Sequence, residues 1–267
     1  MEKRDGWLRI ITLNTWKGDG VYSKRLAEMA NQLRQLHPDI LFLQEAVQSV
    51  DGSVDTAGFL AEFLGLHSVY APARLKIRQI EDKAHVCYSG LAILSSYAII
   101  KQRIDRLPSV AEDLDRISLT AVVALDDKQI LLTNLHLTHL PGADALRLRQ
   151  FAAVTKHINT LCNPSIWLCG GDFNCVLDKH RLQEVSQNSW LQIDDCYLAA
   201  GGHLPGRTLA GNNRPHALGR IDYILNIVGR GMETLCCTNG RVVLERADGN
   251  GVLPSDHFGV MVDILIG

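Results

Sequence analysis

The sequence lacks the long apolar run that a membrane span requires. None of its apolar stretches reaches the roughly 18 residues that a spanning helix needs. Residues 1–9 carry charge but no apolar segment of the kind found in a secretory signal. The sequence therefore predicts neither a transmembrane segment nor export, and we expect a cytoplasmic protein.

Cysteine patterning is also absent. The chain has 7 cysteines, an odd number, and none of them forms a Cys-x-x-Cys pair. The adjacent Cys236 and Cys237 suit neither a disulfide nor a zinc site. Such cysteines are typical of buried or incidental thiols in a reducing compartment.

The chain has no excess of charge and few aromatic residues. Its net charge is −2 and its aromatic content 6%, which argues against a broad basic face for nucleic acid and offers few rings for base stacking. Hydrophobic residues make up 46% and charged residues 21%, an ordinary globular composition. No linker, repeat or low-complexity tract interrupts the chain, so we expect residues 1–267 to form a single domain.

Hydrophobic periodicity predicts many strands and few helices. Helices are expected at 23–36, with Ser23 as the N-cap, and at 56–64 and 143–161. Strands are expected at 8–13, 40–43, 90–94, 118–125, 129–137, 166–169, 221–227 and 260–266. The charged residues 74–83 are expected to form a loop. The opening order of strand, helix and strand indicates an α/β unit.

Polar side chains follow the apolar run at 166–170. Because residues i and i+2 of a strand share a face, Asp172 and Asn174 can converge on one ligand while Phe173 packs the other way. Such a pair suits a hard cation, a water molecule or a phosphoryl oxygen. The alternative is an ordinary turn, which Asp and Asn after two glycines also favour.

Two further groups follow the first two strands. Glu45 ends the strand at 40–43, where a buried carboxylate is costly unless it is paired or binds a cation. This placement favours a magnesium ligand, with a salt bridge to an arginine as the alternative. Asn14 follows the strand at 8–13, where its amide could bind metal-bound water or phosphate, unless it only caps a turn.

Histidines and aspartates recur in the second half of the chain. His136 lies on the strand at 129–137 and is either a core histidine or a group that stabilises phosphoryl charge. Asp222 lies within an apolar strand, where an imidazole or a guanidinium would be its simplest partner. Asp256 and His257 precede the last strand, and a bulge or turn is needed for both to face one site.

These motifs, in this order, resemble those of the endonuclease/exonuclease/phosphatase superfamily, the group of pancreatic deoxyribonuclease. The resemblance rests on the residues already described and on Gln44, the segment 89–95 and the segment 220–223, and it extends from residue 8 to residue 262. It implies an α/β (α+β) fold, a four-layer sandwich in which two packed, mainly antiparallel sheets are flanked by helices. The motifs specify the fold more closely than the substrate.

The resemblance also implies a mechanism, the hydrolysis of a phosphoester by an in-line water with Mg²⁺ or Mn²⁺ as cofactor. It assigns Glu45 as the principal metal ligand, with Asn14 and Asp256 near the same cation. Asp172 and Asn174 would orient or deprotonate the water. His257, held by Asp222, would bind the phosphate or transfer a proton.

His136 corresponds to a histidine of the nuclease, sphingomyelinase and deadenylase branches, which argues against abasic-site repair. Its carboxylate partner is left unassigned, since neither Glu81 nor Asp82 aligns. We expect a phosphodiester substrate, with nucleic acid as one candidate and a lipid, a phosphomonoester or a non-catalytic scaffold as alternatives. The candidate phosphate contacts, solvated charge being the alternative, are Arg74, Lys76, Arg78, Arg207 and Arg214.

Overall fold

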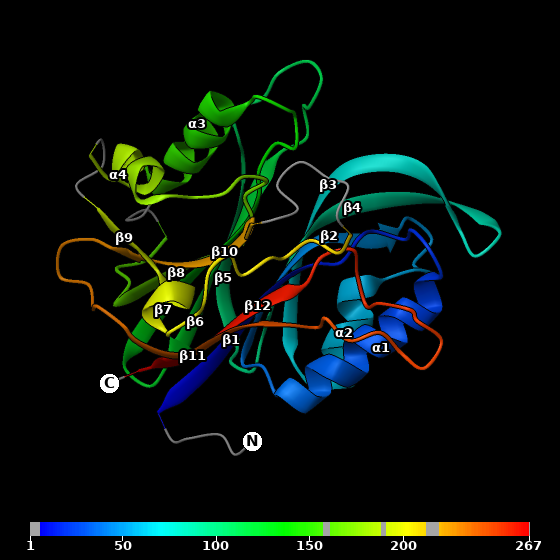
Figure 1. Ribbon diagram of the computed structural model, residues 1–267, viewed down its shortest axis with the longest axis horizontal. Helices are drawn as coiled ribbons and strands as arrows, with labels where there is room; N and C mark the ends of the chain where they lie inside the picture. Colours follow the sequence, from blue (N-terminus) through cyan, green and yellow to red (C-terminus); the bar gives the residue numbers. More distant parts are fainter. Residues whose placement is uncertain (1–5, 157–160, 188–190, 212–218, 267) are drawn as a thin grey trace.

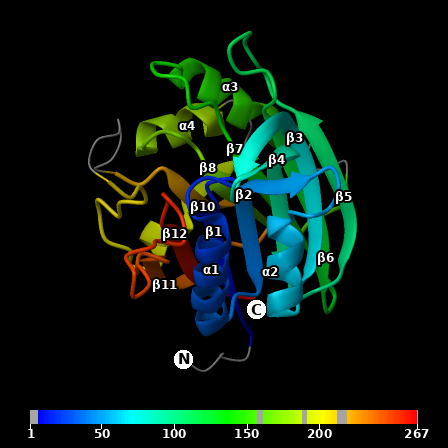
Figure 2. The same ribbon diagram turned by 90° about the vertical axis from the view of Figure 1, so that its right-hand side faces the viewer.

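Two six-stranded sheets pack face to face in the computed structural model, which describes residues 6–156, 161–187, 191–211 and 219–266. Helices α1 and α2 cover the outer face of one sheet, and α3 and α4 lie over the other (Figures 1 and 2). The predicted four-layer sandwich is confirmed. Each sheet is mixed, with one parallel pair of strands in each.

The first sheet has the strand order β11-β12-β1-β2-β4-β3. Its strands are β1 (Trp7–Asn14), β2 (Ile40–Ser49), β3 (His67–Ile80), β4 (Lys83–Ser95), β11 (Cys236–Val243) and β12 (Gly259–Leu265). The N-terminal strand β1 lies between β2 and the C-terminal strand β12. The two ends of the chain therefore meet in one sheet.

The second sheet has the strand order β5-β6-β7-β8-β10-β9. Its strands are β5 (Ile99–Arg106), β6 (Ile117–Leu125), β7 (Lys128–His136), β8 (Ile166–Asp172), β9 (Gln192–Asp195) and β10 (Asp222–Val228). The predicted hairpin of β6 and β7 is confirmed, with its turn at residues 126–127.

The helices are α1 (Tyr22–Leu36), α2 (Thr56–Leu64), α3 (Asp144–Thr155), α4 (Lys179–Gln187) and the short α5 (Cys196–Ala199). Three apolar layers fill the spaces, one under α1 and α2, one between the sheets and one under α3 and α4. The middle layer takes side chains from both sheets, which supports our proposal of a single domain. No helix in the described ranges is both long and apolar enough to cross a membrane.

Two polar side chains tie the sheets together near one edge. Gln44 of β2 donates to Asn134 Oδ1 of β7 at 2.7 Å, and Asn134 donates in turn to the carbonyls of Leu43 and Ala92, each at 2.8 Å. All of these groups are buried, so each hydrogen bond satisfies an atom that water cannot reach. The contact fixes how the two sheets meet beside the polar edge.

The glycines before Asp172 allow close packing there. A Cβ atom on Gly170 would lie 2.2 Å from Phe42 of the opposite sheet. Gly171 has φ +151 and a Cβ atom there would lie 2.1 Å from the carbonyl oxygen of Leu135. A larger residue at 170 would push the two sheets apart, and a larger residue at 171 would push β8 away from β7. The two glycines therefore allow Asp172 to lie close to both sheets.

Several predicted boundaries were wrong. Residues 74–83 are not a loop, because most of them lie in the long hairpin of β3 and β4. Its charged residues alternate with apolar ones, and this alternation is a strand pattern that we overlooked. Strand β2 continues to Ser49 beyond the expected end at Leu43.

Two helix ends also differ from the prediction. Ser23 is not the N-cap of α1, since the helix begins at Tyr22 and its N-cap Val21 has no side-chain capping bond. The Ser23 amide instead donates to Glu81 at 2.8 Å, so a carboxylate from the hairpin tip caps the helix. Helix α3 ends at Thr155, and residues 157–160 of its predicted span lie outside the described residues.

Candidate active site

A cavity of about 510 Å³ opens at the edge where the two parallel strand pairs end. Seven of the eight predicted site residues line it: Asn14, Glu45, His136, Asp172, Asn174, Asp256 and His257. The eighth, Asp222, does not line it but is hydrogen-bonded to His257. Strand register brings part of this set together, because Asp172 pairs with His136 of β7 on one side and with Asp222 of β10 on the other.

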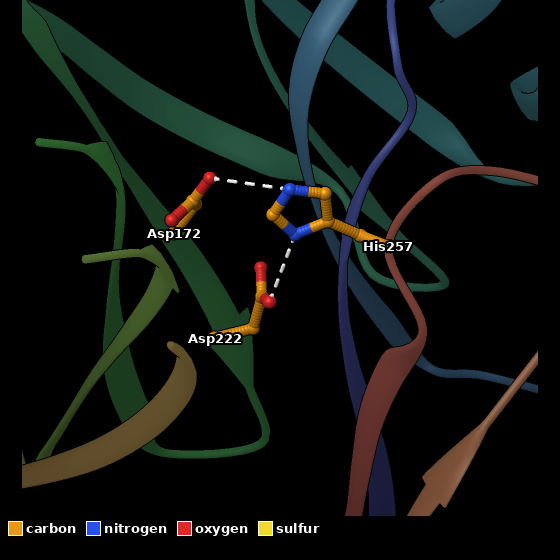
Figure 3. Close-up of side chains that lie close together, drawn as sticks. All are labelled: Asp172, Asp222 and His257. Carbon is orange, nitrogen blue, oxygen red and sulfur yellow. Dashed lines mark hydrogen bonds and ion pairs between the residues drawn. The ribbon is translucent and has the colours of Figure 1, made fainter. Parts of the chain in front are cut away.

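Asp172 lies at the centre of these contacts. Asn14 donates from Nδ2 to Asp172 Oδ2 at 3.0 Å, which joins the two sheets across the site. The Nε2 atoms of His136 and His257 lie 3.5 and 3.8 Å from the same oxygen. A buried carboxylate thus faces one amide and two imidazoles (Figure 3 shows its position beside His257 and Asp222).

His257 lies between two buried carboxylates. Its Nδ1 is 3.0 Å from Asp222 Oδ2, and its Nε2 points toward Asp172 (Figure 3). Asp222 is fully buried at the first residue of β10. Its contact with Nδ1 holds the ring so that Nε2 faces the cavity.

The pKa values of the two histidines are shifted in opposite directions. Burial alone would lower the pKa of His257, but the charge and hydrogen bond of Asp222 outweigh it and raise the pKa to about 10. Burial and the charge of Arg116 lower the pKa of His136 well below its ordinary value. Near neutral pH the site therefore holds one imidazolium and one neutral imidazole.

The pKa of the Asp172 carboxyl is raised, as a proton acceptor requires. Burial and the neighbouring charge of Asp222 raise its pKa to about 7, while His257 and the bond from Asn14 oppose the rise. A carboxylate with a pKa near neutrality can accept a proton and release it again. Both pKa values are raised, so near neutral pH His257 stays protonated while Asp172 can exchange a proton.

Asn174 fits both interpretations that its sequence allowed. It lies beyond the end of β8 with φ +52, and its amide N–H donates to Asp172 Oδ1 at 2.8 Å, which is an Asx turn. It nevertheless lines the cavity with Asp172, while Phe173 packs against Phe151 and Tyr223. The expectation that 172 and 174 share a face of one strand was wrong, because the turn brings them together.

Glu45 reaches the cavity through a backbone irregularity. It lies within β2, where the register with β4 shifts between Leu43 and Ala46, and its φ is +54. A bulge at this point turns the carboxylate toward the cavity. Its Oε1 is 2.8 Å from Lys17 Nζ, so the salt bridge that was the alternative interpretation is present, although its partner is a lysine.

Two sets of residues could hold a metal ion. Asp172, Asp222 and His257 present ligand atoms within 4.8 Å of one another, but His257 uses Nδ1 on Asp222 and its raised pKa favours the protonated ring. A protonated imidazole cannot bind a metal. Glu45, Asn14 and Asp256 instead offer oxygen atoms around the open cavity, and this donor set fits a hard cation such as Mg²⁺.

The structural role of Arg25 in α1 was not predicted from the sequence. It is 2% exposed, and its guanidinium donates to the carbonyls of Thr15, Trp16, Lys17, Asp19 and Pro254 at 2.8–3.3 Å. One buried cation therefore fixes the loop after β1 and the backbone just before Ser255. Within a helical segment an arginine normally signals a solvated face, so no sequence feature pointed to this role.

Arg116, Asp113 and His139 form a second missed cluster. Arg116 donates to Asp113 at 2.7 Å, lies 2.7 Å from His139 Nδ1 and reaches the carbonyl of His136. All three side chains line the cavity. Asp113 and Arg116 come just before β6 and His139 follows β7, and no residue spacing in the sequence pairs them.

Other predicted contacts lie elsewhere. Glu81 caps α1 and is not the partner of His136. Arg147 and Gln150 of α3 bind backbone groups of Thr138 and Leu140 and so support the segment after His136. Arg207 donates to the carbonyls of Leu209 and Gly211 and does not line the cavity. Arg214 lies outside the described residues.

Residues 11–257 match the sequence profile of the Endonuclease/Exonuclease/phosphatase family. Solved structures with the same fold include a humanized D. rerio TDP2 (18% identity, TM-score 0.72, covering 97% of this chain and 99% of that one). The human Nocturnin catalytic domain with a bound sulfate anion is similar as well (19% identity, TM-score 0.69, coverage 97% and 94%).

A third structure of this fold is an endonuclease/exonuclease/phosphatase family protein from Leptotrichia buccalis C-1013-b. It is 17% identical, with a TM-score of 0.72 and coverage of 96% of this chain and 99% of that one. No curated protein matches the sequence at a significant level. At these identities the structural matches establish the fold alone, and the family rests on the profile.

Proposed function

The chain belongs to the endonuclease/exonuclease/phosphatase family, and from this membership we propose that it hydrolyses a phosphodiester bond by in-line attack of water. Enzymes of this family are phosphoester hydrolases that typically use divalent metals. The observation that carries the proposal is the arrangement around Asp172, a buried carboxylate with a raised pKa beside an imidazolium that Asp222 holds in place.

In the proposed reaction Asp172 accepts the proton of the attacking water. The raised pKa of this carboxylate suits that role, and Asn14 and the Asn174 amide keep its two oxygens in position. Asn174 lines the cavity next to it and orients the same water. Losing a positioned base commonly lowers the rate by about 100-fold or more.

His257 would bind the scissile phosphate through Nε2. Its pKa of about 10 keeps the ring charged near neutral pH, so it can donate a charge-assisted hydrogen bond to a phosphoryl oxygen. His136 is neutral in the same range and lies on the other side of Asp172. It contributes a neutral hydrogen bond to the phosphoryl group or to Asp172.

We assign a divalent cation, Mg²⁺ or Mn²⁺, to the oxygen donors of Glu45, Asn14 and Asp256. When bound, such an ion supplies positive charge that stabilises the negative charge developing on the phosphoryl and leaving oxygens. Lys17 contacts Glu45 at 2.8 Å, so the ammonium balances the Glu45 carboxylate in the metal-free protein. We expect the enzyme to act in the cytoplasm, since all seven cysteines are free thiols.

The substrate class is tested by a panel with EDTA controls: plasmid DNA, abasic duplex, poly(A), tyrosyl-ended DNA, sphingomyelin and inositol phosphates. We expect hydrolysis of a phosphodiester in Mg²⁺ and none in EDTA. Hydrolysis that persists in EDTA would contradict the metal requirement. A lack of turnover on every substrate, in the presence of Mg²⁺ or Mn²⁺, would identify a scaffold without catalysis.

A further inference from the structure

Strand β3 carries a row of cations along one side of the cavity. Arg74, Lys76 and Arg78, here called the basic row, alternate along the strand and all line the cavity. Side chains two residues apart in a strand share a face and stand about 6.6 Å apart. The basic row is therefore an evenly spaced line of positive charge that ends at the catalytic site.

The hairpin reverses the usual distribution of polar and apolar residues. The other face of the hairpin carries Leu75, Ile77 and Val86, which are 49%, 73% and 47% exposed. An ordinary antiparallel pair buries its apolar face and directs its charged face to solvent. Here the charged face borders the cavity and the apolar face meets solvent, so the charges are placed for the cavity and not for solubility.

The basic row has few protein partners. Arg74 lies 3.6 Å from Asp115, but both side chains are about 40% exposed (39% and 42%), so this ion pair is weak. Arg78 Nε is buried without a hydrogen-bond partner. No carboxylate of the described chain forms an ion pair with Lys76 or Arg78. A buried N–H group without a partner is costly, and the guanidinium of Arg78 lacks the protein acceptors that hold a structural arginine such as Arg25.

The hairpin is held in place at its tip. Glu81 accepts a hydrogen bond from the Ser23 amide at 2.8 Å. Ile80 packs so closely on the loop after β1 that a Cβ atom on Gly18 would lie 2.5 Å from its Cδ1. The long arch of β3 and β4 thus returns to the start of α1 (Figure 1). The basic row is a fixed surface beside the catalytic residues.

We propose that the basic row is a phosphate track for a single-stranded polynucleotide, which leads its backbone to the catalytic site. This inference rests on the proposed phosphodiesterase function and names its substrate class. Evenly spaced cations on an extended strand suit a polymer with one negative charge per unit. A substrate with a single phosphate needs only the groups around Asp172 and Glu45.

Two observations favour a single strand over a duplex. Trp16 lines the same cavity and is only half-buried, and the Arg25 guanidinium lies 4.7 Å from its ring centroid, which fixes the ring as a platform on which a base can stack. The site is a concave cavity in a protein of net charge −2. A duplex would need a broad basic surface, and this composition does not favour one.

The test compares Lys76→Ala with the matched control Lys83→Ala, which removes the same charge from an exposed position of the hairpin that does not line the cavity. Binding of fluorescent oligothymidylates is measured by anisotropy in EDTA at several salt concentrations. Loss of one phosphate contact reduces the slope of log affinity against log salt by about 0.7 for a single strand. We expect this reduction for Lys76→Ala and a wild-type slope for Lys83→Ala.

The kinetic arm uses oligothymidylates of increasing length and bis(para-nitrophenyl) phosphate, a diester with one phosphate. We expect the loss of kcat/KM in Lys76→Ala to grow with oligonucleotide length and to exceed the loss on the small diester, by roughly three- to ten-fold. Equal losses on all substrates, or equal salt slopes for the two variants, would overturn the track. Tight binding of inositol polyphosphates without binding of oligothymidylates would also overturn it.

The two proposals fail in different ways. If the wild type hydrolyses neither the small diester nor any substrate of the panel in Mg²⁺ or Mn²⁺, the proposed function is wrong, and the anisotropy measurement still reports on the track. If the diester is hydrolysed and oligothymidylate binding does not depend on Lys76, only the track is wrong.

Discussion

The two sides of the cavity beside Asp172 are built in opposite ways. One side, formed by Asn14, Asp172 and His257 with Asp222 behind them, is almost fully buried, and its groups hydrogen-bond to one another across both sheets. The other side, the basic row of β3, is partly exposed and has few protein partners. Most polar atoms of the first side are bonded within the protein, with Asp222 Oδ1 as a buried exception. The second side leaves its charges open to a ligand.

We infer that the buried side carries out the chemistry and that the basic row selects the substrate. A buried, mutually bonded set holds its geometry before substrate arrives, and such preorganisation is the largest electrostatic contribution to most enzymatic rates. Substituting half-exposed cations on an edge strand changes the stability of the protein little. These cations determine which anion binds. The family resemblance is therefore expected at the first side, while substrate preference is expected at the second.

The largest effect is expected when a functional group of the buried side is removed. Asp172→Asn keeps the shape of the side chain but removes its basicity, and we expect kcat to fall by about 100- to 1000-fold. His257→Ala is expected to have a loss of the same order. Rates on several substrates measure the effect, which must be equal on small and long substrates because the same chemical step is impaired.

Circular dichroism and thermal melting serve as the control for these two variants. Both should remain folded, since the three apolar layers do not depend on these side chains. A near-normal rate in either variant would show that the buried side does not carry the chemistry.

A smaller effect is expected at Arg25, which anchors two segments beside the cavity. Arg25→Met leaves five buried or half-buried carbonyls without their donor, and we expect a loss of about 2–4 kcal/mol in the free energy of unfolding, measured with urea. Metal affinity should fall as well, because the loops that carry Lys17 and Asp256 lose their anchor. Arg25→Lys should recover only part of either loss, since one ammonium cannot reach all five carbonyls. Unchanged stability and metal affinity would show that these loops keep their conformation without Arg25.

The pH dependence of His257 is the mildest test. Its folded pKa of about 10 lies above the ordinary value of 6.5. Protonation of His257 therefore contributes stability that is fully present below about pH 6.5 and is lost as the pH rises through 10. NMR titration of the metal-free protein should show this imidazole charged at neutral pH, and Asp222→Asn should lower its pKa. A His257 ring that titrates near 6.5 in the wild type would contradict the assigned role of Asp222.

The sequence predicted the fold and most of the buried side for a physical reason. Apolar strands that end in Asn14 or Asp172, or begin at Asp222, carry a local signal, because a charged or amide group at either end of a buried strand needs a partner. The order of these motifs then identified the family. Seven of the eight predicted residues line one cavity, and the eighth supports His257.

The basic row and Arg25 could not be predicted in the same way. The alternation of charged and apolar residues in β3 indicates a strand, but which of its faces meets the cavity depends on its register with β4. Arg25 serves backbone carbonyls from two distant segments, and such contacts leave no residue pattern. Likewise, the φ of +54 at Glu45 and the pairing with Lys17 follow from a bulge that only the neighbouring strand reveals.

The most direct test of the account is isothermal titration of Mg²⁺ into the wild type, Glu45→Gln and Asp222→Asn. We place the cation on the Glu45 side of the cavity, and we assign proton transfer and phosphate binding to the Asp172, Asp222 and His257 cluster, without a metal. We therefore expect specific uptake in the wild type, uptake that persists in Asp222→Asn, and an affinity at least about ten-fold weaker in Glu45→Gln. Uptake that survives in Glu45→Gln and disappears in Asp222→Asn would contradict this assignment.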